Sequence, residues 1–160
     1  TTLFRSYLTE KLNGYITGAY IYNKMGLTEQ VATTITIATP NPVRRFRFKN
    51  LDIECVKAYC MDYSDESLVP YLRLLDAIKD MKRIPGTTGQ DIYNRVKSQY
   101  FNGYSLPELE KIVSLAKSYP PRVRKVVADI LGDIRQTVLQ TEMAKTILPT
   151  TRFNLDYKTA

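Results

Sequence analysis

The sequence contains no histidine among its 160 residues. A Ser–His–Asp or Cys–His catalytic arrangement is therefore impossible, and any general base would have to be an Asp, Glu, Lys, Tyr or Cys side chain with a shifted pKa. The two cysteines, Cys55 and Cys60, are too few for a disulfide scaffold and cannot alone supply the four ligands of a zinc site. We expect two reduced thiols, no cofactor, no metal and no catalytic activity.

Long apolar runs are also missing. No run approaches the roughly 20 residues that a membrane-spanning helix needs, and the chain does not start with the charged and then apolar pattern of a signal peptide. Hydrophobic residues make up 44% of the chain and charged residues 24%, which is ordinary for a globular protein. We therefore expect a cytoplasmic protein that does not contact a membrane.

Acidic residues are the minority among the charged ones. Lys and Arg number 23 against 16 Asp and Glu, so the formal net charge is +7. Such a balance favours encounters with polyanions or acidic partners through long-range attraction. It does not by itself identify nucleic acid as the partner.

The N-terminal half alternates between helical and strand patterns. Apolar spacing predicts a helix over 3–12, and a second from Thr17, as its N-cap, to Met25, stopped by Gly26. Period-two patterns predict strands over 33–39, 43–49 and 51–59, with a turn at Asn50. We expect these strands to form a small antiparallel sheet.

The C-terminal half reads as helical throughout. Ser64 or Asp65 can cap a helix over 66–84, and Thr88 opens the next helix. Ser105 and Glu108 form a capping box, and the helix after Tyr119-Pro120-Pro121 is expected to continue to Ile147. The fold class is therefore α+β, a small sheet with about five to six helices. We expect one domain over 1–148 and a tail over 149–160, with Phe153, Leu155 and Tyr157 as docking residues.

Asp52 and Glu54 form an acid-x-acid pair on a predicted strand, so both point to the same face. Nucleotidyltransferases hold magnesium with such a pair, and a magnesium-dependent nucleic-acid-modifying enzyme is therefore the alternative function. However, the window 38–43 lacks the glycine of a phosphate-binding turn, and Lys57 falls on the opposite face from the one that a nuclease would need. The other interpretation is a solvated strand face paired with arginines of the preceding strand.

Two groups of cations are candidate binding residues. Arg44, Arg45, Arg47 and Lys49 alternate with phenylalanines, so they could contact phosphates while the rings stack on bases, bind an acidic protein, or simply form the wet face of a strand. Arg122, Arg124 and Lys125 begin a helix, where cations oppose the helix dipole. Acidic groups of a partner could compensate for that cost, or solvent could screen it.

Three segments of the chain together resemble a known family. They are Gly14-Tyr15-Ile16-Thr17-Gly18 with the residues up to Thr39, the run Tyr71 to Asp80, and the run Tyr119 to Arg124. In order and spacing, over roughly residues 13–135, they resemble AbiEi-type antitoxins of type IV toxin–antitoxin systems.

The resemblance implies a two-part bacterial transcriptional regulator linked to phage defence. An N-terminal winged helix would bind operator DNA, and the antitoxin domain would counter a nucleotidyltransferase toxin, without a stable complex. No winged-helix pattern precedes residue 13, so we expect this chain to be the antitoxin domain without that DNA-binding part. The resemblance identifies no neutralising residues.

A third possibility is an oligomerisation module with Tyr15, Tyr20 and Tyr22 at its interface, since tyrosine is enriched at interfaces.

Overall fold

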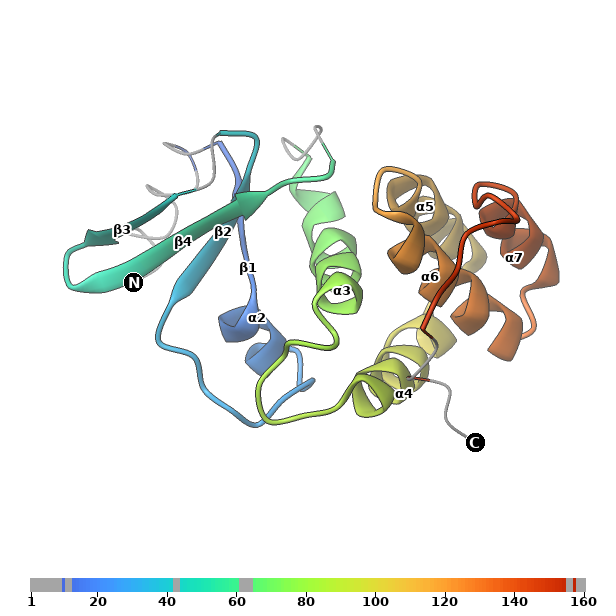
Figure 1. Cartoon of the computed structure of the whole chain (residues 1–160), viewed down its shortest axis with the longest axis horizontal. Coiled ribbons are helices and arrows are strands. Elements are labelled where there is room, and N and C mark those ends of the chain that lie inside the picture. The colour runs from blue at the N-terminus through green and yellow to red at the C-terminus, as the bar shows by residue number, and fades with distance from the viewer. Residues whose placement is uncertain (1–9, 11–12, 42–43, 61–64, 155–156, 158–160) are drawn as a thin grey trace. The chain divides into compact units, whose positions relative to one another are not determined.

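The structure, a computed structural model, describes residues 10, 13–41, 44–60, 65–154 and 157. The chain divides into two units, residues 1–76 and 77–160 (Figure 1), where the sequence was interpreted as one domain over 1–148 and a tail. The predicted helix over 3–12 lies outside the described residues apart from Glu10.

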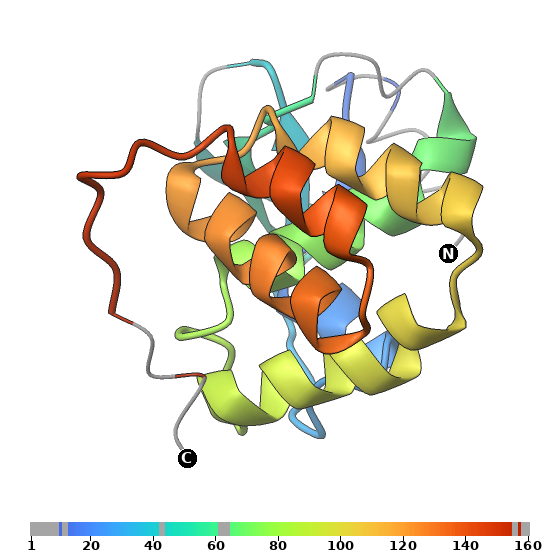
Figure 2. The same ribbon diagram turned by 90° about the vertical axis from the view of Figure 1, so that its right-hand side faces the viewer.

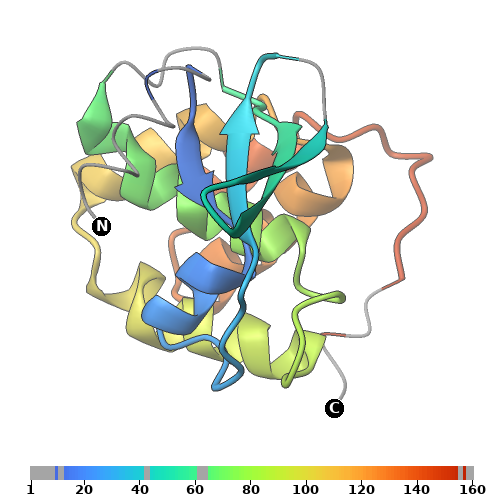
Figure 3. The same cartoon turned by 90° about the vertical axis from the view of Figure 1, so that its left-hand side faces the viewer.

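The first unit contains a four-stranded sheet (Figure 3). Its strands, in the spatial order β1-β2-β4-β3, are β1 (Tyr15–Thr17), β2 (Ile35–Thr39), β4 (Leu51–Lys57) and β3 (Arg45–Phe48). The last three strands confirm the predicted ones, but the sheet is mixed and the prediction of an antiparallel sheet was wrong. β2 and β4 are parallel neighbours because β4 inserts between β2 and β3, an order that alternation along each strand does not encode.

A tight turn joins β3 to β4. Lys49 and Asn50 occupy the turn with φ angles of 48° and 67°. Two successive residues with positive φ are typical of a type I′ turn, whose twist matches that of a two-residue hairpin. The turn sets the register in which Phe48 faces Leu51 and Arg47 faces Asp52.

One face of this sheet is apolar and carries the core of the unit. Helix α2 (Ala19–Lys24) packs Ile21 against it. Thr17 was predicted to cap this helix, but it lies in β1, and Gly18 occupies the N-cap position instead. Gly26, with a φ of 77°, follows the end of the helix, as predicted. The buried cluster on this face consists of Ile16, Ile21, Ile35, Ile37, Ile53 and Cys55.

Helix α3 (Val69–Lys79) contains the boundary between the units, and a short 3-10 turn, η1 (Glu66–Leu68), precedes it. Asp65 caps the turn by accepting a hydrogen bond from the Ser67 backbone N–H at 3.0 Å. The predicted helix over 66–84 is confirmed at its start, because η1 begins at Glu66 and leads into α3. The helix ends at Lys79, five residues before the predicted end. Its apolar residues are largely buried, including Leu72, Leu75 and Ile78.

The second unit is helical (Figure 2). Thr88 and the Ser105–Glu108 capping box start two of its helices, as predicted. After α3, the elements are α4 (Gly89–Gln99), η2 (Phe101–Gly103), α5 (Leu106–Ala116), α6 (Pro121–Asp133) and α7 (Thr137–Ala144).

The prediction of one continuous helix from Pro121 to Ile147 was wrong. The chain breaks between α6 and α7 at Arg135, whose φ is 65°, a left-handed conformation that a helix cannot contain. α7 then packs back against α6. Gly132 faces the side-chain end of Gln140 in α7, because a Cβ there would lie 2.6 Å from Nε2 of that flexible side chain.

The two units together confirm the α+β class with a helical C-terminal half. In the part of the chain that the structure describes, no helix combines the length and the apolar character that crossing a membrane requires.

Candidate functional site

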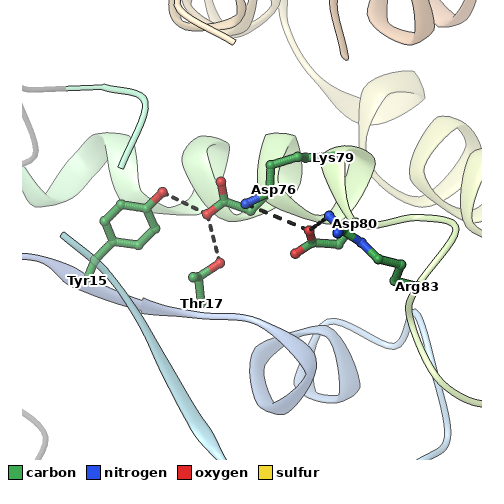
Figure 4. A network of polar contacts seen from close by, with 6 residues as sticks. All are labelled: Tyr15, Thr17, Asp76, Lys79, Asp80 and Arg83. Atoms are coloured by element: carbon green, nitrogen blue, oxygen red, sulfur yellow. Dashed lines mark hydrogen bonds and ion pairs between the residues drawn. The ribbon is translucent and has the colours of Figure 1, made fainter. Parts of the chain in front are cut away.

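Two segments that carry the family resemblance meet at one buried carboxylate. Asp76 of α3 is 2% exposed. Its Oδ2 accepts hydrogen bonds from the Tyr15 hydroxyl at 2.7 Å and from the Thr17 hydroxyl at 2.8 Å (Figure 4). A buried carboxylate needs such donors because desolvating it without partners is costly. Tyr15 and Thr17 are therefore fastened to a residue that lies 61 and 59 positions further along the sequence.

A second contact strengthens the junction between β1 and α3. Arg73 donates from Nε to the backbone carbonyl of Ile16 at 2.9 Å. Burial lowers the pKa of Arg73 from its ordinary value, and the nearby Tyr15 and Asp76 oppose that shift. The guanidinium thus satisfies a strand carbonyl that would otherwise need water.

Two glycines of the same segment have steric roles. A Cβ on Gly14 would lie 2.0 Å from the carbonyl oxygen of Ala38, so any side chain would separate β1 from β2. Gly18 has a φ of 83°, which side-chain-bearing residues rarely adopt. The Gly14-Tyr15-Ile16-Thr17-Gly18 segment is thus explained by packing and hydrogen bonding around β1.

The first group of predicted binding cations lies on the β3–β4 hairpin. Arg47 Nη1 is 3.3 Å from Asp52 Oδ1, and Arg45 Nη2 is 3.9 Å from Glu54 Oε2. Both arginine side chains remain mostly in solvent, 68% and 72% exposed. Since exposed pairs are weak, these cations can exchange partners at little cost. They border a shallow depression of about 290 Å³.

The other two members of that group lie beside phenylalanine rings. Arg44 places its guanidinium carbon 4.9 Å from the centre of the Phe46 ring, and Lys49 places Nζ 5.6 Å from the Phe48 ring. Both rings are half-buried and pack against the apolar core. The strand therefore has one wet face and one core face. Phe46 lines the depression together with Arg45 and Arg47, although its ring packs against the apolar core.

Asp52 and Glu54 do share a face, as predicted, and each lies opposite an arginine. This arrangement confirms the interpretation of a solvated strand face paired with the preceding strand. Among the described residues, no group of three or more His, Cys, Asp or Glu side chains could hold a metal ion. Ion pairing with Arg45 and Arg47 would also compete with a cation at this position.

The second group of predicted binding cations makes contacts within its own unit. Arg122 Nη1 donates to the Asn154 carbonyl at 3.0 Å, and Lys125 Nζ lies 3.0 Å from Asp129 Oδ1. Arg124 donates to the carbonyls of Tyr119 and Thr146. These contacts explain how cations are accommodated at the start of α6, where the helix dipole disfavours them.

Tyr157 confirms the predicted docking of the tail, and its partners were not predicted. Its hydroxyl donates to Asp129 Oδ2 at 2.8 Å, and its ring stacks on Tyr93 with centroids 5.0 Å apart. Tyr93 in turn donates to Asp133 Oδ2 at 2.6 Å. Burial, then the hydrogen bond to Asp133, raise the pKa of Tyr93 above its ordinary value of 10. Of the other docking candidates, Phe153 is half-buried and Leu155 lies outside the described residues.

Both cysteines are thiols, as expected. Cys55 is 1% exposed within the apolar cluster. Burial raises the pKa of its thiol, although Arg44 opposes the shift, so the reactive thiolate is disfavoured.

No family model, curated protein or solved structure matches this chain.

Proposed function

We propose that the chain is the antitoxin domain of an AbiEi-like bacterial transcriptional regulator. In this role it counters a nucleotidyltransferase toxin in the cytoplasm by binding, without catalysis. Operator DNA would be bound by a winged helix outside these residues. The toxin need not form a stable complex with the domain.

The observation that carries the proposal is the convergence of two resemblance segments on Asp76. Tyr15 and Thr17 come from one segment, and Asp76 and Arg73 from the other. Their joint role in fastening β1 to α3 supports treating the two segments as one structural signature.

The exposed cations of the hairpin are the proposed contact residues. Arg44, Arg45, Arg47 and Lys49 are all exposed, whereas the cations of α6 are used inside their unit. An acidic surface of the partner would be attracted by the net charge of +7. We therefore place the contact on the β3–β4 hairpin rather than at the start of α6.

A growth-rescue assay tests the function. The chain would be co-expressed with the nucleotidyltransferase toxin encoded beside its gene, and growth would be compared with that of cells expressing the toxin alone. We expect rescue by the wild-type chain. If the folded, well-expressed chain fails to rescue growth but a longer product of the same gene succeeds, the assignment of the activity to these residues is contradicted. If both fail, the assignment to the family is contradicted.

A further inference from the structure

β3 forms one edge of the sheet. Among the described residues, β3 has a strand partner on one side, β4, and lies at the end of the sheet (Figure 3). An edge strand presents unpaired N–H and C=O groups that can accept another strand. At the opposite end of the sheet, the guanidinium of Arg73 reaches the backbone of β1.

The register identifies which residues of β3 point their backbone groups outward. The Cys55 N–H donates to the Arg44 carbonyl at 2.8 Å, so Arg44 and Cys55 form a hydrogen-bonded pair. In an antiparallel ladder such pairs alternate with non-bonded ones, so Arg45 and Arg47, opposite Glu54 and Asp52, direct their N–H and C=O groups away from β4. The outward backbone groups and the exposed guanidinium groups thus belong to the same two residues.

Side-chain rows across the sheet determine what an added strand should carry. On the polar face, the rows run from Glu54 to Arg45 and from Asp52 to Arg47. On the other face, Phe46 and Phe48 are half-buried at the margin of the apolar cluster. A strand beside β3 would continue these rows, since directly opposite side chains on adjacent strands are in contact range.

We propose that the edge of β3 binds an extended segment of a protein partner in which acidic residues alternate with apolar ones. The segment adds to the sheet as an antiparallel strand. Its acids lie beside Arg45 and Arg47, and its apolar residues extend the contact surface of Phe46 and Phe48. β4 has the same pattern on the other side of β3, because Asp52 and Glu54 alternate there with Leu51 and Ile53. The proposal does not depend on the chain being an antitoxin domain.

Charge argues against two other occupants. If two copies of β3 paired with each other, arginines would lie beside arginines, which is destabilising. A nucleic acid lying across the polar face would bring its phosphates towards Asp52 and Glu54 as well as towards the arginines. An added strand instead places its acids about 10 Å from those carboxylates, two strand spacings away.

The test uses the full chain and a synthetic eight-residue peptide that alternates glutamate with valine. We expect the amide resonances of Arg45 and Arg47 to shift on titration, and their hydrogen exchange to slow as their N–H groups become paired. A peptide N-methylated at its glutamates keeps the charge but loses the N–H groups that face β3, and it should not bind. Equal binding of both peptides would overturn strand addition in favour of simple charge attraction.

Two double variants complete the experiment. Arg45→Glu with Arg47→Glu should weaken peptide binding by at least about tenfold, because two attractive rows become repulsive. Arg83→Glu with Arg152→Glu makes the same charge change at two exposed arginines of the second unit and should leave binding unchanged. Equal loss in both variants, tighter competitive binding of a DNA oligonucleotide of equal charge, or no peptide binding at all would each contradict the proposal. In the last case the arginines would act only to prevent edge-to-edge aggregation.

Discussion

Residues 1–76 and residues 77–160 each bury an aspartate that accepts a tyrosine hydroxyl from a distant segment. In the first unit, Asp76 accepts from Tyr15 and Thr17. In the second, Asp129 accepts from Tyr157 and from Lys125. Both arrangements hold a terminal part of their unit in place with charge-assisted hydrogen bonds, which are stronger than neutral ones.

The units differ in how they use their arginines. The start of α6 engages Arg122 and Arg124 in hydrogen bonds to backbone carbonyls of its own unit. The β3–β4 hairpin leaves Arg45 and Arg47 mostly in solvent. A run of cations is thus structural where buried or half-buried contacts hold it. It is available for a partner where its contacts are exposed, as in the pairs of Arg45 and Arg47 and the 3.5 Å contact of Arg47 Nη2 with the Asn50 carbonyl.

The largest effect is expected at Asp76. Replacing it in Asp76→Ala leaves two buried hydroxyls without their acceptor and removes a charge that stabilises Arg73. We expect a loss of about 3–5 kcal/mol in the free energy of unfolding, measured by urea denaturation of the full chain.

Asp80→Ala is the matched control, because it makes the same substitution one helical turn later. Asp80 forms ion pairs with Lys79 and Arg83 at 3.8 and 3.3 Å (Figure 4), and its side chain is 26% exposed. Pairs of this kind contribute about 1 kcal/mol or less. Similar losses for the two variants would show that Asp76 has no special role.

The next effect concerns Tyr157. Tyr157→Ala removes the ring that stacks on Tyr93 as well as the hydrogen bond to Asp129, and should cost about 3 kcal/mol. Tyr157→Phe keeps the ring and should cost about 1 kcal/mol. Hydrogen exchange over residues 149–154 should accelerate strongly in the first variant and little in the second. Unchanged exchange in Tyr157→Ala would mean that other contacts hold this segment.

The pH dependence of stability should report on Tyr93. Its pKa is raised above 10 in the folded chain, so the folded state retains the phenol proton when the unfolded state loses it. The contribution of Tyr93 to stability is therefore fully present below pH 10. It falls as the pH rises further, by about 1 kcal/mol between pH 10 and pH 11. Tyr93→Phe should flatten that part of the profile. An unchanged slope would assign the alkaline transition to other groups.

The smallest effect on stability is expected at the hairpin arginines. Arg45→Ala and Arg47→Ala should each change the free energy of unfolding by less than about 1 kcal/mol, since both ion pairs are exposed. Arg124→Ala, which removes contacts to two carbonyls, should cost more. The reverse order in urea denaturation would remove the distinction between structural and available cations.

Local signals predicted much of the fold. The Ser105–Glu108 capping box, the Thr88 cap and the alternation along β2, β3 and β4 depend on residues close in sequence, and the structure confirms them. The parallel pairing of β2 with β4 and the break at Arg135 were missed. Both depend on which segments become neighbours in space, which periodicity alone does not specify.

The same reason explains what was missed at the candidate sites. The partners of Asp76 and Asp129 lie far away in sequence, so no local pattern identifies them. A signal was nevertheless present, because each aspartate stands in a helix between apolar residues, Leu75 and Ala77 in one case and Ala128 and Ile130 in the other. The structure buries both carboxylates, and a buried carboxylate must be satisfied by hydrogen bonds. The exposed pairs of Asp52 and Glu54 were predicted because they lie on neighbouring strands of one hairpin.

Growth rescue by charge variants tests the central claim most directly. The wild-type chain, the Arg45→Glu/Arg47→Glu variant and the Arg83→Glu/Arg152→Glu control would be co-expressed with the neighbouring nucleotidyltransferase toxin, after equal stability of the three has been established. We predict rescue by the wild type and the control, and loss of rescue by the hairpin variant. Full rescue by the hairpin variant would contradict the assignment of the β3 edge as the surface through which this domain acts.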